Sequence, residues 1–210
     1  MLIPARFEAL TPALSREGAG EGAARSPEDG GGKRIAETSV KTHKLTLAAS
    51  FLALGVLFPV VFHAIGLGGV FLPMFWPVAA SGFFLPLSLA VLVGVLTPVL
   101  SLLLTGMPPP PILPVMMPEL AVLAATVHMM RRKAGMAVWP SLFLGLLVSR
   151  AVLFFSARLL GRTLGLPPHW ASAAELARSL PGLAAILLFV PAVVGRLLHE
   201  SVFLRRRPHG

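Results

Sequence analysis

The sequence predicts an all-α membrane protein with six transmembrane helices and with both termini on the cytoplasmic side. Three observations lead to this fold class: long apolar stretches, few charges, and basic clusters at the ends of alternate stretches. Of the 210 residues, 55% are hydrophobic and 13% are charged, and the mean hydropathy is +0.80. Soluble domains carry about 25% charged residues, and an apolar stretch of about 18 residues or more is typical of a membrane span.

Six apolar segments account for most of the chain. They are predicted at residues 45–65, 71–84, 85–104, 115–130, 136–160 and 181–204. A helix needs about 20 residues to cross the hydrocarbon core, so the second and fourth segments are short. The second is also interrupted by Pro73 and Pro77. Such broken backbone is tolerated in a membrane where it lines a cavity instead of facing lipid.

The first 42 residues differ in composition from the rest. They are rich in Gly, Ala, Glu and Arg and have no apolar periodicity. Such a segment buries too little apolar surface to offset its chain entropy, so we expect a disordered tail. It has no continuous apolar core of the kind found in a signal peptide. The predicted organisation is a tail at residues 1–42 and a six-helix membrane domain at residues 43–207.

Basic residues indicate the orientation. Lys41 and Lys44 precede the first segment, Arg131–Lys133 separates the fourth from the fifth, and Arg205–Arg207 follows the sixth. Counting crossings from a cytoplasmic N-terminus places all three groups inside, as the positive-inside rule requires. We therefore expect a multi-pass protein of the cytoplasmic membrane. Membrane orientation also explains the net charge of +9 better than nucleic-acid binding does, because the bases do not line one face of a soluble element.

The stretch "TGMPPPPILPVMMPEL", residues 105–120, interrupts the apolar sequence with six prolines and ends near Glu119. Consecutive prolines predict a stiff extended segment, which can serve as a lid over a pocket or as a plain connection. Glu119 is the only charged residue between Leu45 and Met130. A carboxylate in a membrane segment usually faces a cavity or a partner, and Arg150 in the fifth segment is within reach. The two residues form either a structural ion pair or a polar binding site.

Aromatic and histidine residues near the predicted outer face are further candidates. Phe75 and Trp76 lie in the broken second segment and could stack on a flat ligand. His63 ends the first segment, and with no second histidine nearby we expect no metal site. The chain has no cysteine, so thiol chemistry and cysteine-ligated metals are excluded. We expect no cofactor.

Catalysis is not predicted. "AASG", residues 79–82, only superficially matches the Gly-x-Ser-Gly of intramembrane serine proteases, because Ala79 replaces the first glycine. His128 and His199 lie at the predicted cytoplasmic ends of helices, which is a poor position from which to activate Ser81. The chain also has no nucleotide-binding loop and cannot power transport with ATP by itself.

Four stretches over residues 44–160 together resemble the substrate-binding S components of energy-coupling factor (ECF) transporters. They are "KLTLAASFLALGVLFPVVFH", "GGVFLPMFWPV", "PLSLAVLVGVLTPVLSLLLTGMPP" and "PVMMPELAVLAA". The resemblance implies a six-helix fold that captures a vitamin or vitamin precursor from outside. It also implies a separate membrane T subunit and two ATPase subunits as partners. In that family, small residues at Ala-x-x-x-Ala spacing on the first helix contact the T subunit, and Ala49 and Ala53 match this spacing here.

The same resemblance suggests which residues bind the ligand. One subgroup reads approximately "LPMHIPV" where this chain has "LPMFWPV", so Phe75 replaces an imidazole. "TGMPP" and "MMPEL" do match, which adds Met107 and Met117 to the candidates. In this interpretation Glu119 binds a ligand donor or cation, Arg150 pairs with Glu119 or with a ligand acceptor, and Phe75 and Trp76 stack on a ring.

Two other functions remain open at this point. The chain could be an intramembrane enzyme that uses Ser81 or Glu119. It could also be a non-catalytic assembly subunit in which Glu119 and Arg150 form only a structural pair. The scarcity of polar side chains favours a small, flat, weakly polar heterocycle if a ligand is bound.

Overall fold

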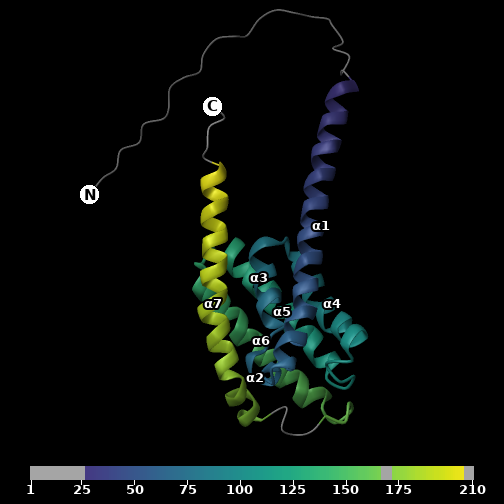
Figure 1. The fold of residues 1–210 in the computed structure, drawn as a ribbon, viewed down its shortest axis with the longest axis vertical. Coiled ribbons are helices and arrows are strands. Elements are labelled where there is room, and N and C mark those ends of the chain that lie inside the picture. The colour runs from purple at the N-terminus through teal and green to yellow at the C-terminus, as the bar shows by residue number, and fades with distance from the viewer. Residues whose placement is uncertain (1–26, 167–171, 206–210) are drawn as a thin grey trace, which may run out of the picture. The chain divides into compact units, whose positions relative to one another are not determined.

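The computed structural model describes residues 27–166 and 172–205. The chain divides into two units, residues 1–38 and residues 39–210, and the described part of the first unit, residues 27–38, is helical. All regular structure in the described residues is helical. The helices are α1 (Pro27–Ala64), α2 (Gly68–Phe71), α3 (Phe75–Phe84), α4 (Leu87–Thr105), α5 (Leu113–Arg132), α6 (Val138–Leu160) and α7 (Ala173–Arg205) (Figure 1).

Five stretches of these helices are long and apolar enough to cross a membrane. They are Thr38–Ala64, Leu87–Thr105, Leu113–Arg132, Val138–Leu160 and Leu176–Leu197. Large apolar side chains on them are open to the surroundings, as at Leu103, which is 74% exposed, and Leu159, which is 79% exposed. Water would disfavour such surfaces, whereas lipid does not. The five helices therefore indicate a multi-pass membrane protein.

The predicted second segment is divided in two. α2 ends at Phe71, and Leu72 follows in the left-handed region with φ of 49° and ψ of 55°. Pro73 comes next, and α3 begins at Phe75. The prediction that Pro77 also interrupts the segment was wrong, because it is the third residue of α3, where a missing backbone N–H costs little. With 10 residues, α3 is about 15 Å long, which is too short to cross a membrane alone.

The first helix begins earlier than the composition suggested. Residues 1–26 of the predicted disordered tail lie outside the described residues, but α1 starts at Pro27, so residues 27–42 are helical. Extending an existing helix by one residue costs much less free energy than nucleating a new helix, so the apolar part of α1 favours helix in the residues before it. Pro27 suits a first helical position. The expectation of disorder is corrected for these sixteen positions.

The last helix also begins earlier than predicted. α7 starts at Ala173 instead of near residue 181, and both Pro181 and Pro191 lie inside it. The part of the predicted domain beyond Arg205 lies outside the described residues. Proline within a membrane helix is tolerated because neighbouring helices and side chains can satisfy the freed carbonyls.

Helix α5 lies at the centre of the bundle and packs against α3, α4 and α6 (Figure 1). Glycines let these helices approach closely. A Cβ atom at Gly82 would lie 2.8 Å from the Ala124 carbonyl oxygen on α5, and one at Gly94 would lie 2.7 Å from that of Leu120. Because lipid gives apolar side chains no reason to associate, such close backbone packing is a main source of stability between membrane helices.

Candidate functional site

The structure brings three of the predicted site residues together in the interior. Glu119 on α5 and Arg150 on α6 form an ion pair, with Glu119 Oε1 contacting Arg150 Nη2. The side chains are only 3% and 11% exposed, respectively. The Arg150 Cζ atom lies 4.5 Å from the centroid of the Phe75 ring on α3. One carboxylate, one guanidinium and one aromatic face from three different helices therefore meet at a single buried position.

The pair is deep in its helices. Glu119 lies six residues after Leu113, which places it about 9 Å from the start of α5. Arg150 lies ten residues before Leu160, which places it about 15 Å from the end of α6. A Cβ atom at Gly145 on α6 would lie 2.6 Å from the Val127 side chain and 3.5 Å from the Leu123 carbonyl oxygen on α5, and Leu153 packs with Val115. Arg150 therefore lies about level with Glu119 on the neighbouring helix. Either charge alone would be unfavourable at such a depth, because it would be buried without a counter-charge.

Apolar residues lie on both sides of the ion pair along the direction of α5 and α6. Toward the start of α5 and the end of α6 lies a small buried cluster, in which Leu164 and Leu166 from the segment after α6 cover Val115, Leu153 and Ala157. In the other direction the main core begins. Its residues nearest in sequence to the pair are Leu120, Leu123 and Leu146. The polar pair is thus enclosed between two apolar layers, which strengthens its electrostatic interaction.

The hydrogen-bonding capacity of the pair is not fully used. Within the described part of the chain, Glu119 Oε1 and the Arg150 atoms Nε and Nη2 are buried without a hydrogen-bond partner. Of these three atoms, Oε1 and Nη2 contact each other in the ion pair. Arg150 Nε is therefore the one of the three with neither a hydrogen bond nor an ion-pair contact, and a buried polar atom of this kind normally has a partner.

Trp76 does not belong to this site. Its ring packs on Phe62 of α1, with 6.2 Å between centroids, and on Phe189 of α7, with 5.7 Å. Its indole Nε1 donates a hydrogen bond of 3.1 Å to the Phe71 carbonyl. Consecutive helical residues point about 100° apart, so Phe75 and Trp76 point to different sides of α3. Trp76 instead connects α1, α2, α3 and α7.

The remaining candidates are His63, Met107 and Met117. His63 is exposed, and its Nδ1 lies 2.8 Å from the Pro59 carbonyl of the preceding turn. Met107 is 48% exposed on the loop before α5, and Met117 on α5 is partly buried. Among the described residues, no group of three or more His, Cys, Asp or Glu side chains could bind a metal ion.

The proline-rich loop is compact, which differs from the extended segment predicted for it. The backbone N–H of Ile112 donates to the Pro109 carbonyl at 3.0 Å, and that of Leu113 donates to the Pro110 carbonyl at 3.3 Å. These turns lead directly into α5, with Pro114 in its first turn. Pro118 also lies inside α5. The loop therefore ends in hydrogen-bonded turns at the start of α5, and Glu119 lies almost two helical turns further along α5.

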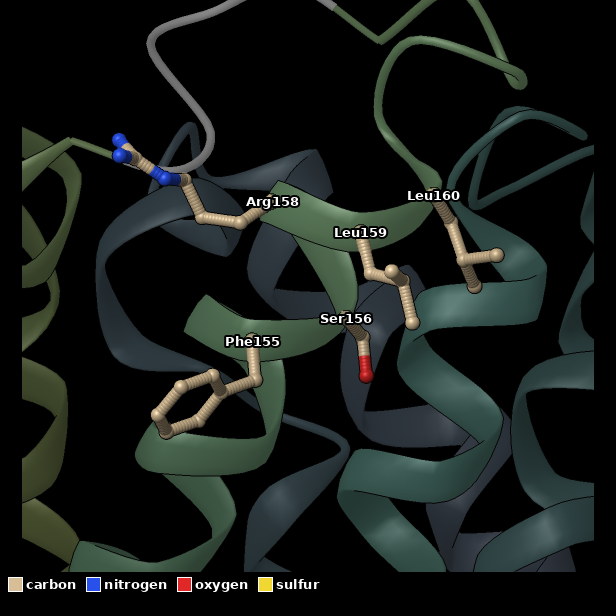
Figure 2. Close-up of a pocket in the computed structure, with 5 residues that line it drawn as sticks. All are labelled: Phe155, Ser156, Arg158, Leu159 and Leu160. Carbon is tan, nitrogen blue, oxygen red and sulfur yellow. The ribbon is translucent and has the colours of Figure 1, made fainter.

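Ala49 and Ala53 are exposed on α1 and line a groove between α1 and α4 with a volume of about 640 Å³. The other residues that line this groove are also apolar: Leu52, Val56, Leu57, Val60, Leu100 and Leu104. A second groove of about 420 Å³ lies at the end of α6, where Phe155 and Arg158 point to one side of the helix and Leu159 and Leu160 to the other (Figure 2). Neither of these two grooves is lined by Glu119 or Arg150.

Sequence reasoning missed the contact between Arg150 and Phe75 and the apolar layer around Val115. The only available signal for the first was that Arg150 and Phe75 both lie in segments assigned to the outer half of the membrane. For the second, the spacing of Val115 and Glu119, one helical turn apart, places both on the same face of α5.

Phe75→Leu tests whether the ring interacts with Arg150. We expect the variant to lower the free energy of unfolding by about 0.5–2 kcal/mol, because leucine keeps much of the apolar volume but has no π face for the guanidinium. Thermal unfolding in detergent measures the change. Phe155→Leu is the control, because Phe155 is 71% exposed and should leave the transition unchanged. Equal effects of the two variants would show that the ring contact is not stabilising.

The fold and the buried pair together define the class: an α-helical multi-pass membrane protein with a buried ion pair in its interior. Comparison with protein-family models, with curated proteins and with solved structures finds no match for this chain.

Proposed function

We propose that this chain is the substrate-capture component of an ECF-type importer. It would bind a small vitamin or vitamin precursor from outside. The observation that carries the proposal is the meeting of Glu119, Arg150 and Phe75 at one buried position with unused hydrogen-bonding atoms. A buried ion pair contributes little net stability to a fold compared with well-packed apolar residues, so its presence in a membrane interior favours a binding role.

The proposed partners follow from the resemblance to S components. The chain would capture ligand alone and deliver it inward only with a T subunit and two ATPases, so it would not be an enzyme itself. The exposure of Ala49 and Ala53 beside an apolar groove is compatible with a helix-packing surface there. In this proposal, α3 and the five longer helices make the six-helix domain, and both termini are cytoplasmic. The membrane would be the bacterial inner membrane.

Mass spectrometry of small molecules released from the purified, detergent-solubilised protein tests the capture function. We expect one stoichiometric vitamin-like compound, because an S component should bind tightly enough to retain ligand through purification. A protein that releases nothing and binds no vitamin or precursor from a panel would contradict the proposal. The assembly-subunit function would then explain the ion pair.

The enzyme alternative uses Ser81 or Glu119, and it would need a base close to Ser81. The Ser81 side chain is fully buried, and its hydroxyl donates a 2.7 Å hydrogen bond to the Val78 carbonyl in its own helix. A nucleophilic serine needs a base within hydrogen-bond reach, whereas this hydroxyl is directed at a backbone acceptor.

Ser81→Ala is therefore expected to leave ligand retention unchanged, because the hydroxyl only bonds its own backbone. The amount of compound released per mole of protein measures the effect. Ser149→Ala is the matched control, since the Ser149 hydroxyl bonds the Leu146 carbonyl in the same way, at 2.9 Å. Accumulation of an unprocessed compound in Ser81→Ala but not in Ser149→Ala would instead favour the enzyme.

A further inference from the structure

The chemistry of the buried pair restricts the kind of ligand it can bind. This inference rests on the proposed function, because it concerns the ligand of the same site. Glu119 supplies only acceptor atoms, and Arg150 supplies only donor atoms. Arg150 Nε has no hydrogen-bond partner within the described part of the chain, and Glu119 Oε1 and Arg150 Nη2 contact each other in the ion pair. Because Oε1 has a second lone pair and Nη2 has a second N–H, both side chains keep capacity for a further hydrogen bond. A ligand that used this capacity on both sides would have to present a donor to Glu119 and an acceptor to Arg150.

The charges of the site are balanced before a ligand arrives. One carboxylate faces one guanidinium, and both side chains are almost fully buried between apolar layers. A cation that displaced Arg150 from Glu119 would leave the guanidinium buried without a counter-charge. An anion that displaced Glu119 from Arg150 would likewise leave the Glu119 carboxylate buried without a counter-charge. Since an unpaired charge in an apolar interior is strongly unfavourable, a ligand without net charge preserves the balance best.

The Phe75 ring adds a shape requirement. The planar guanidinium of Arg150 lies over this ring, with Cζ 4.5 Å from the centroid. A flat group that enters between the carboxylate and the guanidinium would meet the same aromatic face, and stacked arrangements of flat groups are favourable there. A bulky tetrahedral group would have to push α3 away from α6, which the close packing of the interior opposes.

We propose that the ligand is a planar molecule without net charge that carries a donor and an acceptor on adjacent atoms, as an amide edge does. It binds between the Glu119 carboxylate and the Arg150 guanidinium, so that each charged group makes a hydrogen bond to it. The two side chains separate to admit the ligand and pair again when it leaves.

Three probes of equal size and shape test this proposal. Benzamide is uncharged and has a donor beside an acceptor, benzamidinium is a cation with donors only, and benzoate is an anion with acceptors only. Binding to the intact, ligand-free protein in detergent is measured for each at up to about 10 mM by isothermal titration calorimetry, a range suited to fragments of this size. We expect benzamide to bind at least about tenfold more tightly than either charged probe.

Two variants and a control locate the effect. Glu119→Gln leaves Arg150 as the only charge and should change the preference to benzoate, whereas Arg150→Met should change it to benzamidinium. Arg158→Gln is the control. It removes a guanidinium that is also on α6 but lies outside the site, 5.7 Å from the centroid of the Phe154 ring, so the preference for benzamide should persist. The ranking of probes by the wild-type protein does not depend on whether the variants fold.

Tighter binding of benzamidinium or benzoate by the wild-type protein would overturn the proposal, and so would binding of none of the three. The proposed function is tested separately by the compound released from purified protein. Release of a compound with a net charge would leave the capture function in place and overturn only the inference about the ligand.

Discussion

Glu119→Leu is expected to lower the free energy of unfolding by about 3–5 kcal/mol, because it leaves the Arg150 guanidinium buried without a counter-charge. Arg150→Met should be similarly destabilising, since it leaves the carboxylate alone. The double variant should regain most of the loss, because apolar residues of similar size replace a buried ion pair at little cost. Thermal unfolding in detergent, calibrated against denaturant, measures all three.

Ligand binding separates the two functions of the pair. A purely structural pair predicts that the double variant behaves like the wild-type protein in every respect. A binding site predicts a double variant that is folded and stable but binds no ligand. A double variant as unstable as the single ones would contradict the view that the two side chains mainly balance each other.

Gly94→Ala is expected to destabilise the protein by about 1–3 kcal/mol through overpacking between α4 and α5. The added Cβ would lie 2.7 Å from the Leu120 carbonyl oxygen and 2.8 Å from the Ala121 Cα and N atoms. Backbone atoms inside a packed helix cannot move aside as the end of a flexible side chain can. Because the clash occurs one residue from Glu119, the same change should also weaken ligand binding.

Gly195→Ala on α7 is the matched control. Among the described residues nothing lies within 4 Å of a Cβ atom placed there. Alanine favours a helix over glycine by about 1 kcal/mol, so this variant should be neutral or slightly stabilising. Unfolding transitions of the two variants should therefore shift in opposite directions. A stabilising Gly94→Ala would mean that α4 and α5 are not packed as closely as the structure has them.

The helical segments could be predicted well from hydropathy, because a membrane requires long apolar stretches with satisfied backbones. Four of the predicted segments coincide with α1, α4, α5 and α6 to within a few residues at most ends. The start of α1 and the start of α7 could not be found this way. Their first turns are polar and extend beyond the apolar stretches, so hydropathy carries no signal for them.

The ion pair could be predicted because each partner is a rare charge in an apolar segment. The role of Phe75 could not, because the sequence does not show which side of a short, broken helix faces α6. The same ambiguity placed Trp76 in the site, although the structure directs it toward α1 and α7. The predicted lid was treated as an extended polyproline segment, whereas hydrogen bonds from Ile112 and Leu113 fold it into turns. Such local bonds depend on the start of the following helix, which the proline count alone does not reveal.

Native mass spectrometry of the intact protein, beside the Glu119→Leu/Arg150→Met double variant, tests most directly whether the buried pair is a ligand site. We predict one small-molecule adduct per chain on the wild-type protein and none on the double variant, with both proteins folded. An adduct of the same mass and occupancy on both would contradict the account, because it would place the ligand away from Glu119 and Arg150.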